Sequence, residues 1–173
     1  NGLVVSAVAD TENGQRGILI EINAETDFVA KNDKFIAMAD EILEAAVEAG
    51  ACCVNSVRAA KLGEGTVQDR VDGMIAIIGE KMEVSHVAVL EGEHVEAYMH
   101  RTNPDLPPQV GVLVATDAGA ALDLHTADDR NGIGDRGILV PNCRAGLDLE
   151  ARHSCTDPQT FTVVFEQTQL GDL

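Results

Sequence analysis

The sequence predicts an α+β fold in which antiparallel strands pack against helices. Two observations carry this prediction: several short segments show the apolar alternation or short apolar runs typical of strands, and two longer segments repeat apolar residues every three or four positions, as helices do. These segments occur in mixed order, without the regular alternation of a doubly wound parallel sheet. The chain has 173 residues, 45% of them hydrophobic, which is enough for a buried core.

The first element expected is an antiparallel hairpin. Residues 3–9 form a short apolar run and residues 17–23 are rich in β-branched side chains, so both segments are predicted to be strands. Asn13-Gly14 between them is a strong turn signal. The polar stretch 10–16 predicts a loop longer than two residues.

An amphipathic helix is expected after this hairpin. Asn32 suits its N-cap, and Gly50 suits the position just after its end. One side of this helix is apolar and consists of Phe35, Ile36, Ala39, Ile42, Leu43, Ala46 and Val47. Residues 26–32, between strand and helix, are predicted to form a short helical turn.

A second amphipathic helix is expected after a connection over residues 51–65. It begins at a capping box from Thr66 to Asp69 and ends at Gly79. Its apolar side consists of Val67, Val71, Met74, Ile75 and Ile78. The spacing of these five residues places them on one face.

Strands are predicted again after the second helix. Residues 81–91 alternate, with Met82, Val84, His86, Ala88 and Leu90 on one face and Glu83, Ser85, Val87, Val89 and Glu91 on the other. Residues 94–100 are expected to form its partner strand after a turn at Gly92. An irregular loop follows, with Pro104, Pro107 and Pro108. Residues 110–115 form a continuous apolar run, typical of a buried strand.

The remainder of the chain lacks a clear pattern. Residues 126–147 have no apolar period and many Gly, Asp and Arg. Residues 160–167 are expected to form one isolated strand.

The charge of the chain excludes some partners. Twelve basic residues stand against 29 acidic ones, a net charge of −17, so direct binding to nucleic acid is disfavoured. A basic protein partner, a cation, or acidity that only keeps the chain in solution all remain open. No apolar stretch approaches the roughly 20 residues that span a bilayer, so no membrane contact is expected. The cysteines, Cys52, Cys53, Cys143 and Cys155, contain no CxxC pair and are expected to be free thiols.

Two segments contain side chains of the kinds that bind metal ions. His94 and His100, with Glu96 between them, suit either a divalent metal or plain surface histidines, and the second interpretation is favoured. The acidic segment 128–135 does not follow the EF-hand pattern, because Ile133 stands where a ligand is needed. We therefore expect no metal and no cofactor.

Three segments together resemble the elongation factor Ts family. Residues 25–32 (ETDFVAKN) are similar to the family's TDFVAKN signature, which also lies between the second strand and the long helix. Residues 78–82 (IGEKM), followed by 90–92 (LEG), resemble the next family segment. Residues 98–100 (YMH) and 111–114 (GVLV) resemble its next two strands. The three segments occur in the family's order, which is more specific than one motif alone.

This resemblance divides the chain into three parts. Residues 1–92 correspond to the core N-subdomain of the dimerisation type, which carries the exchange motif, and residues 93–124 to the start of a second subdomain. Residues 125–173 form a tail that resembles nothing in the family, and both a disordered and a folded tail remain open. The loop 105–108 resembles the form found in actinobacterial members.

The chain also departs from the family. The small helical ubiquitin-associated-type domain that begins a family member is absent, and the first residue is Asn1, so we expect a truncated protein. Divergence, a cloning artefact and a shifted reading frame remain open for the tail. Ser85-His86 replaces the usual Arg-Arg. Because fewer contacts remain, we expect weak binding and poor or absent exchange.

The resemblance implies a guanine-nucleotide exchange factor for elongation factor Tu, without bond chemistry of its own. Phe28 would be the wedge beside the partner's magnesium site, and Asp27 its polar companion. The residues expected to contact the partner are Thr26, Asp27, Phe28, Val29, Lys31, Asn32, Ile78 and Gly79. The resemblance further implies a cytoplasmic protein of translation elongation and leaves a homodimer open.

Three alternative interpretations remain open. Phe28 could instead be a hydrophobic staple that packs on the following helix. The chain could dock on elongation factor Tu without promoting exchange. A small metal-dependent hydrolase, built on the histidines and the acidic segment, is the most distant hypothesis.

Overall fold

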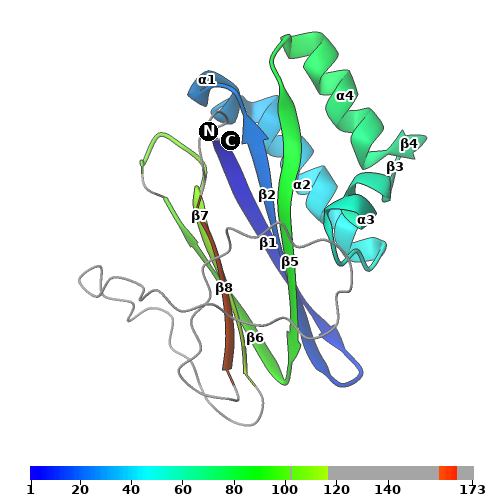
Figure 1. Ribbon diagram of the computed structural model, residues 1–173, viewed down its shortest axis with the longest axis vertical. Coiled ribbons are helices and arrows are strands. Elements are labelled where there is room, and N and C mark those ends of the chain that lie inside the picture. Colours follow the sequence, from blue (N-terminus) through cyan, green and yellow to red (C-terminus); the bar gives the residue numbers. More distant parts are fainter. Residues whose placement is uncertain (102, 117–159, 167–173) are drawn as a thin grey trace.

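A computed structural model describes residues 1–101, 103–116 and 160–166 (Figure 1). Its elements are β1 (Gly2–Thr11), β2 (Gly14–Ala24), α1 (Asp27–Ala30), α2 (Asp33–Glu48), α3 (Val54–Ala59), β3 (Lys61–Leu62), β4 (Gly65–Thr66), α4 (Val67–Ile78), β5 (Met82–Gly92), β6 (His94–His100), β7 (Val110–Thr116) and β8 (Thr160–Glu166). Antiparallel strands with helices confirm the α+β class. Across these described ranges, no helix combines the length and apolar character needed to cross a bilayer.

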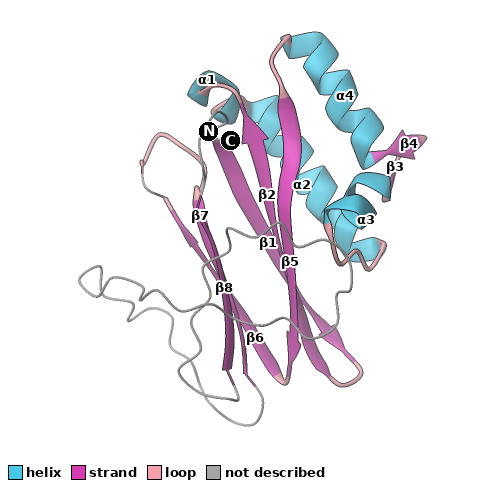
Figure 2. Cartoon of the chain, in the orientation of Figure 1, coloured by secondary structure: helices cyan, strands magenta, loops and turns pink. Residues whose placement is uncertain are grey.

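The main elements form three layers. Strands β1-β2-β5 make one antiparallel sheet and β6-β7-β8 make another, while β3 and β4 form a two-residue hairpin. The helices cover one face of the β1-β2-β5 sheet, and the second sheet packs against its other face (Figure 2). The first sheet is therefore the middle layer and separates two hydrophobic cores.

Alternation along the strands produces these two cores. Neighbouring side chains of a strand point to opposite faces, so Leu3 and Ile18 face the helices while Val4 and Leu19 face the second sheet. The core between the sheets also contains Leu90, Val95, Leu113 and Ala115. The helix-side core contains the apolar side of α2, including Phe35, Met38 and Ile42.

The predicted hairpin is confirmed, but its predicted loop length is wrong. Thr11 pairs with Gly14, so only Glu12 and Asn13 lie outside the ladder. The polar stretch continues the strands because its side chains bond to each other: Nε2 of Gln15 donates to Oδ1 of Asp10 at 3.0 Å. Polarity therefore indicated exposure here, not a loop.

Both predicted helices and the short helical turn are confirmed. Asn32 caps α2, and Gly50 follows its C-cap with a φ of 60°. Thr66 and Asp69 form the capping box of α4, and Gly79 ends that helix in the left-handed conformation. Glycine suits this position because other residues rarely adopt a positive φ.

The predicted connection over 51–65 is wrong in part, because it contains α3 and the β3–β4 hairpin. The Ser56 hydroxyl oxygen accepts the backbone N–H groups of Cys52 (2.9 Å) and Cys53 (3.0 Å), which fixes the start of α3. Arg58 then donates to the carbonyl oxygen of Val84 at 2.7 Å, which ties α3 to β5.

The predicted faces of β5 are wrong over half of its length. The register with β2 shifts between Glu21 and Ile22: Glu21 pairs with His86 and Ile22 with Val84, so Ser85 is an extra residue. Met82 and Val84 therefore share the helix side with Val87 and Val89. Such a bulge reverses the alternation at one point, and a strict two-residue period cannot reveal it.

The later strands are confirmed, but two of their predicted pairings are wrong. β6 pairs with β7 and not with β5, and β8 pairs with β7, so it is not isolated. The change from one sheet to the other falls between Gly92 and His94. The division into residues 1–92, 93–124 and 125–173 stays a prediction, and most of the last part lies outside the described residues.

Candidate functional site

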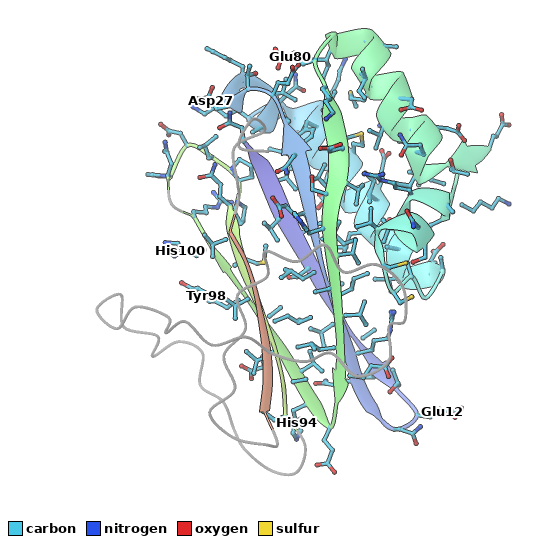
Figure 3. The ribbon with its side chains drawn as sticks, viewed as in Figure 1. Glu12, Asp27, Glu80, His94, Tyr98 and His100 are labelled. Carbon is cyan, nitrogen blue, oxygen red and sulfur yellow. The ribbon has the colours of Figure 1, made fainter. Side chains whose placement is uncertain are left out.

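Residues 25–32, which carry the signature, lie between the end of β2 and the start of α2. Asp27 in α1 and Glu80, just after α4, lie at the same end of the molecule, whereas Glu12 lies at the opposite end (Figure 3). Two segments more than fifty residues apart in the chain thus meet at one end of the central sheet.

Thr26 joins these two segments through its side chain. As the N-cap of α1, its hydroxyl oxygen accepts the backbone N–H of Val29 at 3.4 Å. The same hydroxyl donates to Oε2 of Glu80 at 2.7 Å. Because an ionised acceptor shortens and strengthens such a bond, this contact fixes α1 against the end of α4.

Glu25 adds two further bonds to the same junction. Its backbone N–H donates to the carbonyl oxygen of Lys81 at 3.2 Å, and its Oε2 accepts the backbone N–H of Lys81 at 2.8 Å. Glu25 and Thr26 together therefore hold the turn against residues 80–81 by three hydrogen bonds.

Phe28 points away from the protein. Its side chain is 83% exposed, whereas Val29 is 3% exposed and Ala30 is fully buried. Val29 packs in the helix-side core and anchors α1, so the ring stands outward on a fixed base. The interpretation of Phe28 as a hydrophobic staple is therefore wrong. Asp27, beside it, is also exposed.

The other predicted contact residues have mixed positions. Lys31 is exposed, and exposed Asn32 accepts the backbone N–H of Lys34 at 2.9 Å as the cap of α2. Gly79 is exposed, while Ile78 is half-buried and packs against the helix-side core. The turn thus presents Asp27, Phe28 and Lys31 to solvent and uses Val29 for packing.

Sequence reasoning missed two parts of this end of the molecule. Glu80 was quoted only within a family segment, although its carboxylate bonds Thr26. Ile77 was not singled out, although it is 72% exposed. A signal was present, because Ile77 lies outside the apolar spacing that gives α4 its buried side.

Ser85 and His86 bond within the sheet instead of at this surface. Nδ2 of Asn23 donates to the Ser85 hydroxyl oxygen at 2.8 Å, and Nδ1 of His86 lies 2.7 Å from Oε2 of Glu21. Both partners on β2 are buried, Glu21 at 2% exposure and Asn23 at 5%. The residues that replace the family's Arg-Arg therefore form hydrogen bonds with buried polar side chains of the neighbouring strand.

The described residues contain no group of three or more His, Cys, Asp or Glu side chains able to hold a metal ion. His94 and His100 lie at opposite ends of β6 (Figure 3). The acidic segment 128–135 lies outside the described residues.

The chemistry available at the turn suits contact with another protein. An exposed aromatic ring, a neighbouring carboxylate and a fixed backbone are the properties of an interface anchor. Because the backbone is already ordered, little conformational entropy is lost when a partner covers it.

Comparison with known proteins gives one consistent result. The family model described as "Elongation factor TS" matches residues 25–127, which include the whole turn. Elongation factor Ts of Beutenbergia cavernae is 52% identical over 122 residues, 69% of this chain and 43% of the relative. That of Kineococcus radiotolerans is 46% identical over 132 residues, 73% of this chain and 46% of the relative.

A third relative extends the match into the C-terminal part. Elongation factor Ts of Bifidobacterium adolescentis is 41% identical over 160 residues, 92% of this chain and 55% of the relative. Since 92% of the chain cannot lie within its first 124 residues, the similarity continues farther than expected. The chain spans about half the length of the curated relatives it matches. These relatives are mostly actinobacterial.

Proposed function

The chain belongs to the elongation factor Ts family, and we propose from this membership that it acts on elongation factor Tu and promotes the release of GDP. The observation that carries the proposal is the exposure of Phe28 on a turn held by three hydrogen bonds. A side chain that inserts into another molecule must be exposed, and the backbone that carries it must keep its position on contact. An exposed ring on a fixed base meets both requirements.

In the proposed mechanism the turn disturbs the partner's nucleotide site. The ring of Phe28 inserts beside the bound magnesium ion, and the carboxylate of Asp27 contacts a polar group next to it. A bound divalent cation is often the largest local charge in a phosphate site, so its displacement weakens the hold on GDP. Thr26 and Glu80 act behind the turn and keep the ring in position.

Magnitudes show that the ring does not act alone. Accelerating release by about ten-thousand-fold requires about 5.5 kcal/mol of differential stabilisation. Burying one Phe side chain contributes roughly 1.5–3 kcal/mol. The remainder is assigned to the weakened magnesium contact and to other parts of the interface.

No covalent bond is made or broken by this chain in the proposal. Binding of the exchange factor and binding of GDP oppose each other, and by linkage each lowers the affinity for the other by the same factor. In this proposal the protein acts as an exchange factor and does not catalyse a covalent reaction. It acts in the cytoplasm, where translation elongation takes place.

The test measures release of a fluorescent GDP analogue from elongation factor Tu. The unaltered chain is expected to accelerate release, and Phe28→Ala is expected to remove most of the acceleration. Val8→Ala is the matched control, because Val8 is also an exposed apolar residue, at 38% exposure, on the far part of β1. Equal acceleration by the unaltered chain and Phe28→Ala would exclude Phe28 from the proposed role.

A second candidate is a docking module that binds elongation factor Tu without exchange. It is favoured by one observation: the residues of this chain span about half the length of the relatives, so an interface made by these residues alone is smaller than one made over a relative's whole length. Stable complexes commonly bury roughly 1,200–2,000 Å² in total. Direct binding without faster release of the analogue would select this second function.

A further inference from the structure

The segment that joins α2 to α3 carries two neighbouring thiols at the surface. Cys52 is exposed and Cys53 is partly exposed, and the side chain of Cys52 hydrogen-bonds to that of Cys53. This pair lies away from the turn of α1. The backbone N–H of Val67 donates to the carbonyl oxygen of Ala60, which places α3 beside the start of α4, whereas α1 lies beside the segment that follows the end of α4 (Figure 1).

The backbone around the two thiols is fixed on both sides. Before them, Nη2 of Arg16 donates to the carbonyl oxygen of Ala51 at 2.6 Å. After them, the hydroxyl oxygen of Ser56 accepts the backbone N–H groups of Cys52 at 2.9 Å and Cys53 at 3.0 Å. The same hydroxyl donates to the carbonyl oxygen of Cys53 at 2.8 Å. Both sulfur atoms are therefore carried by an ordered backbone.

The surroundings of Cys53 favour its thiolate. Its Sγ lies 3.4 Å from the hydroxyl oxygen of Ser56. Hydrogen bonding by the side chain and backbone of Ser56, together with that of the Cys52 side chain, lowers the pKa of Cys53 and outweighs the opposite effect of partial burial. The thiolate is the form that attacks a disulfide, and partial exposure leaves Sγ accessible to a small molecule.

We propose that Cys53 is a site of reversible modification by low-molecular-weight disulfides, and that the reaction stops at the mixed disulfide. The Cys53 thiolate attacks one sulfur atom of the small disulfide and forms a bond with it. The original S–S bond breaks, and the other half leaves as a thiolate that takes up the proton lost by Cys53. The small disulfide is thus the oxidant, and one half of it is reduced to a thiol. An added thiol reverses the reaction by attacking the mixed disulfide.

A disulfide between the two cysteines does not follow, because their positions in the chain oppose it. It would form if the Cys52 thiolate attacked Sγ of Cys53 and displaced the small thiol. The peptide bond between them is trans, and such a bond holds neighbouring Cα atoms about 3.8 Å apart. Ordinary disulfides join Cα atoms that are about 4.4–6.8 Å apart. Closing the ring would also distort the backbone that Ser56 holds at both residues, so the mixed disulfide persists.

The experiment uses the full chain, with glutathione disulfide as the probe. After incubation near neutral pH, the remaining thiols are blocked with N-ethylmaleimide, and the chain is digested with trypsin without a reducing agent. The peptide of residues 35–58 contains Cys52 and Cys53 but neither Cys143 nor Cys155. Mass spectrometry should find this peptide with one glutathionyl group and one maleimide. Treatment with dithiothreitol before the blocking step should remove the glutathionyl group.

Two matched single variants assign the modified sulfur atom. Cys52→Ser keeps Cys53 with a hydroxyl beside it, and this variant should still take up one glutathionyl group on the peptide. Cys53→Ser keeps the more exposed thiol, and its peptide should be modified about ten-fold more slowly because that thiol lacks the contact with Ser56. Thermal unfolding checks that both variants keep the fold.

Each other outcome counts against the proposal. Modification of Cys53→Ser as fast as that of Cys52→Ser would overturn the assignment to Cys53. A peptide that carries neither a glutathionyl group nor maleimide contains an internal disulfide, and would overturn the claim that the reaction stops at the mixed disulfide. A peptide that carries only maleimide, on both thiols, would exclude the site. Since elongation factor Tu is absent from the experiment, these outcomes leave the proposed function unaffected.

Discussion

Nδ1 of His86 lies 2.7 Å from Oε2 of Glu21, and the side chain of Glu21 is only 3% exposed. The second carboxylate oxygen of Glu21, Oε1, is buried without a hydrogen bond from the described residues. When one oxygen of a buried carboxylate has no hydrogen bond, the stability of the fold depends strongly on the partner of the other oxygen. The strand pair β2–β5 therefore carries a polar contact whose loss should be costly.

The first prediction concerns this pair. His86→Ala should lower the free energy of unfolding by about 2–4 kcal/mol, because it leaves the Glu21 carboxylate buried without its partner. Urea unfolding at neutral pH measures the change. The double variant Glu21→Gln/His86→Ala should recover part of the loss, since a neutral amide is easier to bury. A single variant as stable as the unaltered chain would contradict the dependence on His86.

The second prediction concerns the contact between the two sheets. A Cβ atom on Gly17 would lie 2.6 Å from both Cδ1 of Leu113 and Cγ1 of Val95, which are buried. Gly17→Ala should therefore cost about 1–3 kcal/mol by forcing the sheets apart. Chemical denaturation measures it.

Gly73 provides the matched control for this substitution. It lies inside α4, and a Cβ there would meet nothing within 4 Å. Gly73→Ala should stabilise the protein by about 0.5–1 kcal/mol, because alanine favours a helix interior. If both alanine variants shift stability in the same direction, the close packing at Gly17 does not limit the fold.

The third prediction concerns pH. The hydroxyl and the backbone N–H of Thr66 both donate to Oδ2 of Asp69 at 2.8 Å, and these bonds lower the pKa of Asp69 from its ordinary value of 3.8. A folded-state pKa below the unfolded one means that the carboxylate stabilises the fold above the unfolded pKa. That contribution is lost as the pH falls through the folded pKa.

Asp69→Asn should therefore flatten the dependence of stability on pH between about pH 5 and pH 2. Thermal unfolding across that range compares the variant with the unaltered chain. Asp72→Asn is the control, because it removes a carboxylate from the same helix outside the capping box. Identical slopes for Asp69→Asn and the unaltered chain would show that the capping box does not carry this linkage.

The fourth prediction concerns two neighbouring thiols. Sγ of Cys53 lies 3.4 Å from the Ser56 hydroxyl oxygen, and hydrogen bonding by Ser56 lowers the pKa of Cys53. Because the thiolate is the reactive form, Cys53 should be alkylated faster than Cys52 near neutral pH. Exposure alone predicts the opposite order, since Cys52 is the more exposed of the two.

Mass spectrometry after brief treatment with iodoacetamide measures this order. Trypsin releases residues 35–58 as one peptide with both thiols and neither of the other two cysteines. Fragmentation of that peptide assigns the label. Ser56→Ala should slow the labelling of Cys53, and faster labelling of Cys52 in the unaltered chain would refute the prediction.

The parts of the fold that follow a simple period could be predicted from the sequence. The apolar side of α2, the capping box of α4 and the run that became β7 are local patterns, and local patterns determine local structure. The bulge at Ser85 could not be predicted in this way, because one extra residue breaks the period and its cause is a neighbouring strand. The pairing of β6 with β7 likewise depends on contacts distant in the chain.

The candidate site was predictable in composition but not in orientation. Residues 25–32 could be recognised from their letters, yet the sequence left Phe28 open between a packed and an exposed position. Its exposure depends on Val29 and Ala30, which occupy the buried side of α1. Glu80 lies against this turn because three hydrogen bonds join two distant segments. The spacing of residues along the chain does not predict such a contact between distant segments.

The three bonds between residues 25–26 and 80–81 also bear on how the protein tolerates change. They fix the turn that carries Phe28 against the segment that follows α4. Insertions in the hairpin at Glu12 or in the β3–β4 turn lie outside this junction and should leave it intact. One extra residue between Gly79 and Met82 would disturb it directly, so natural length variation should be least tolerated there.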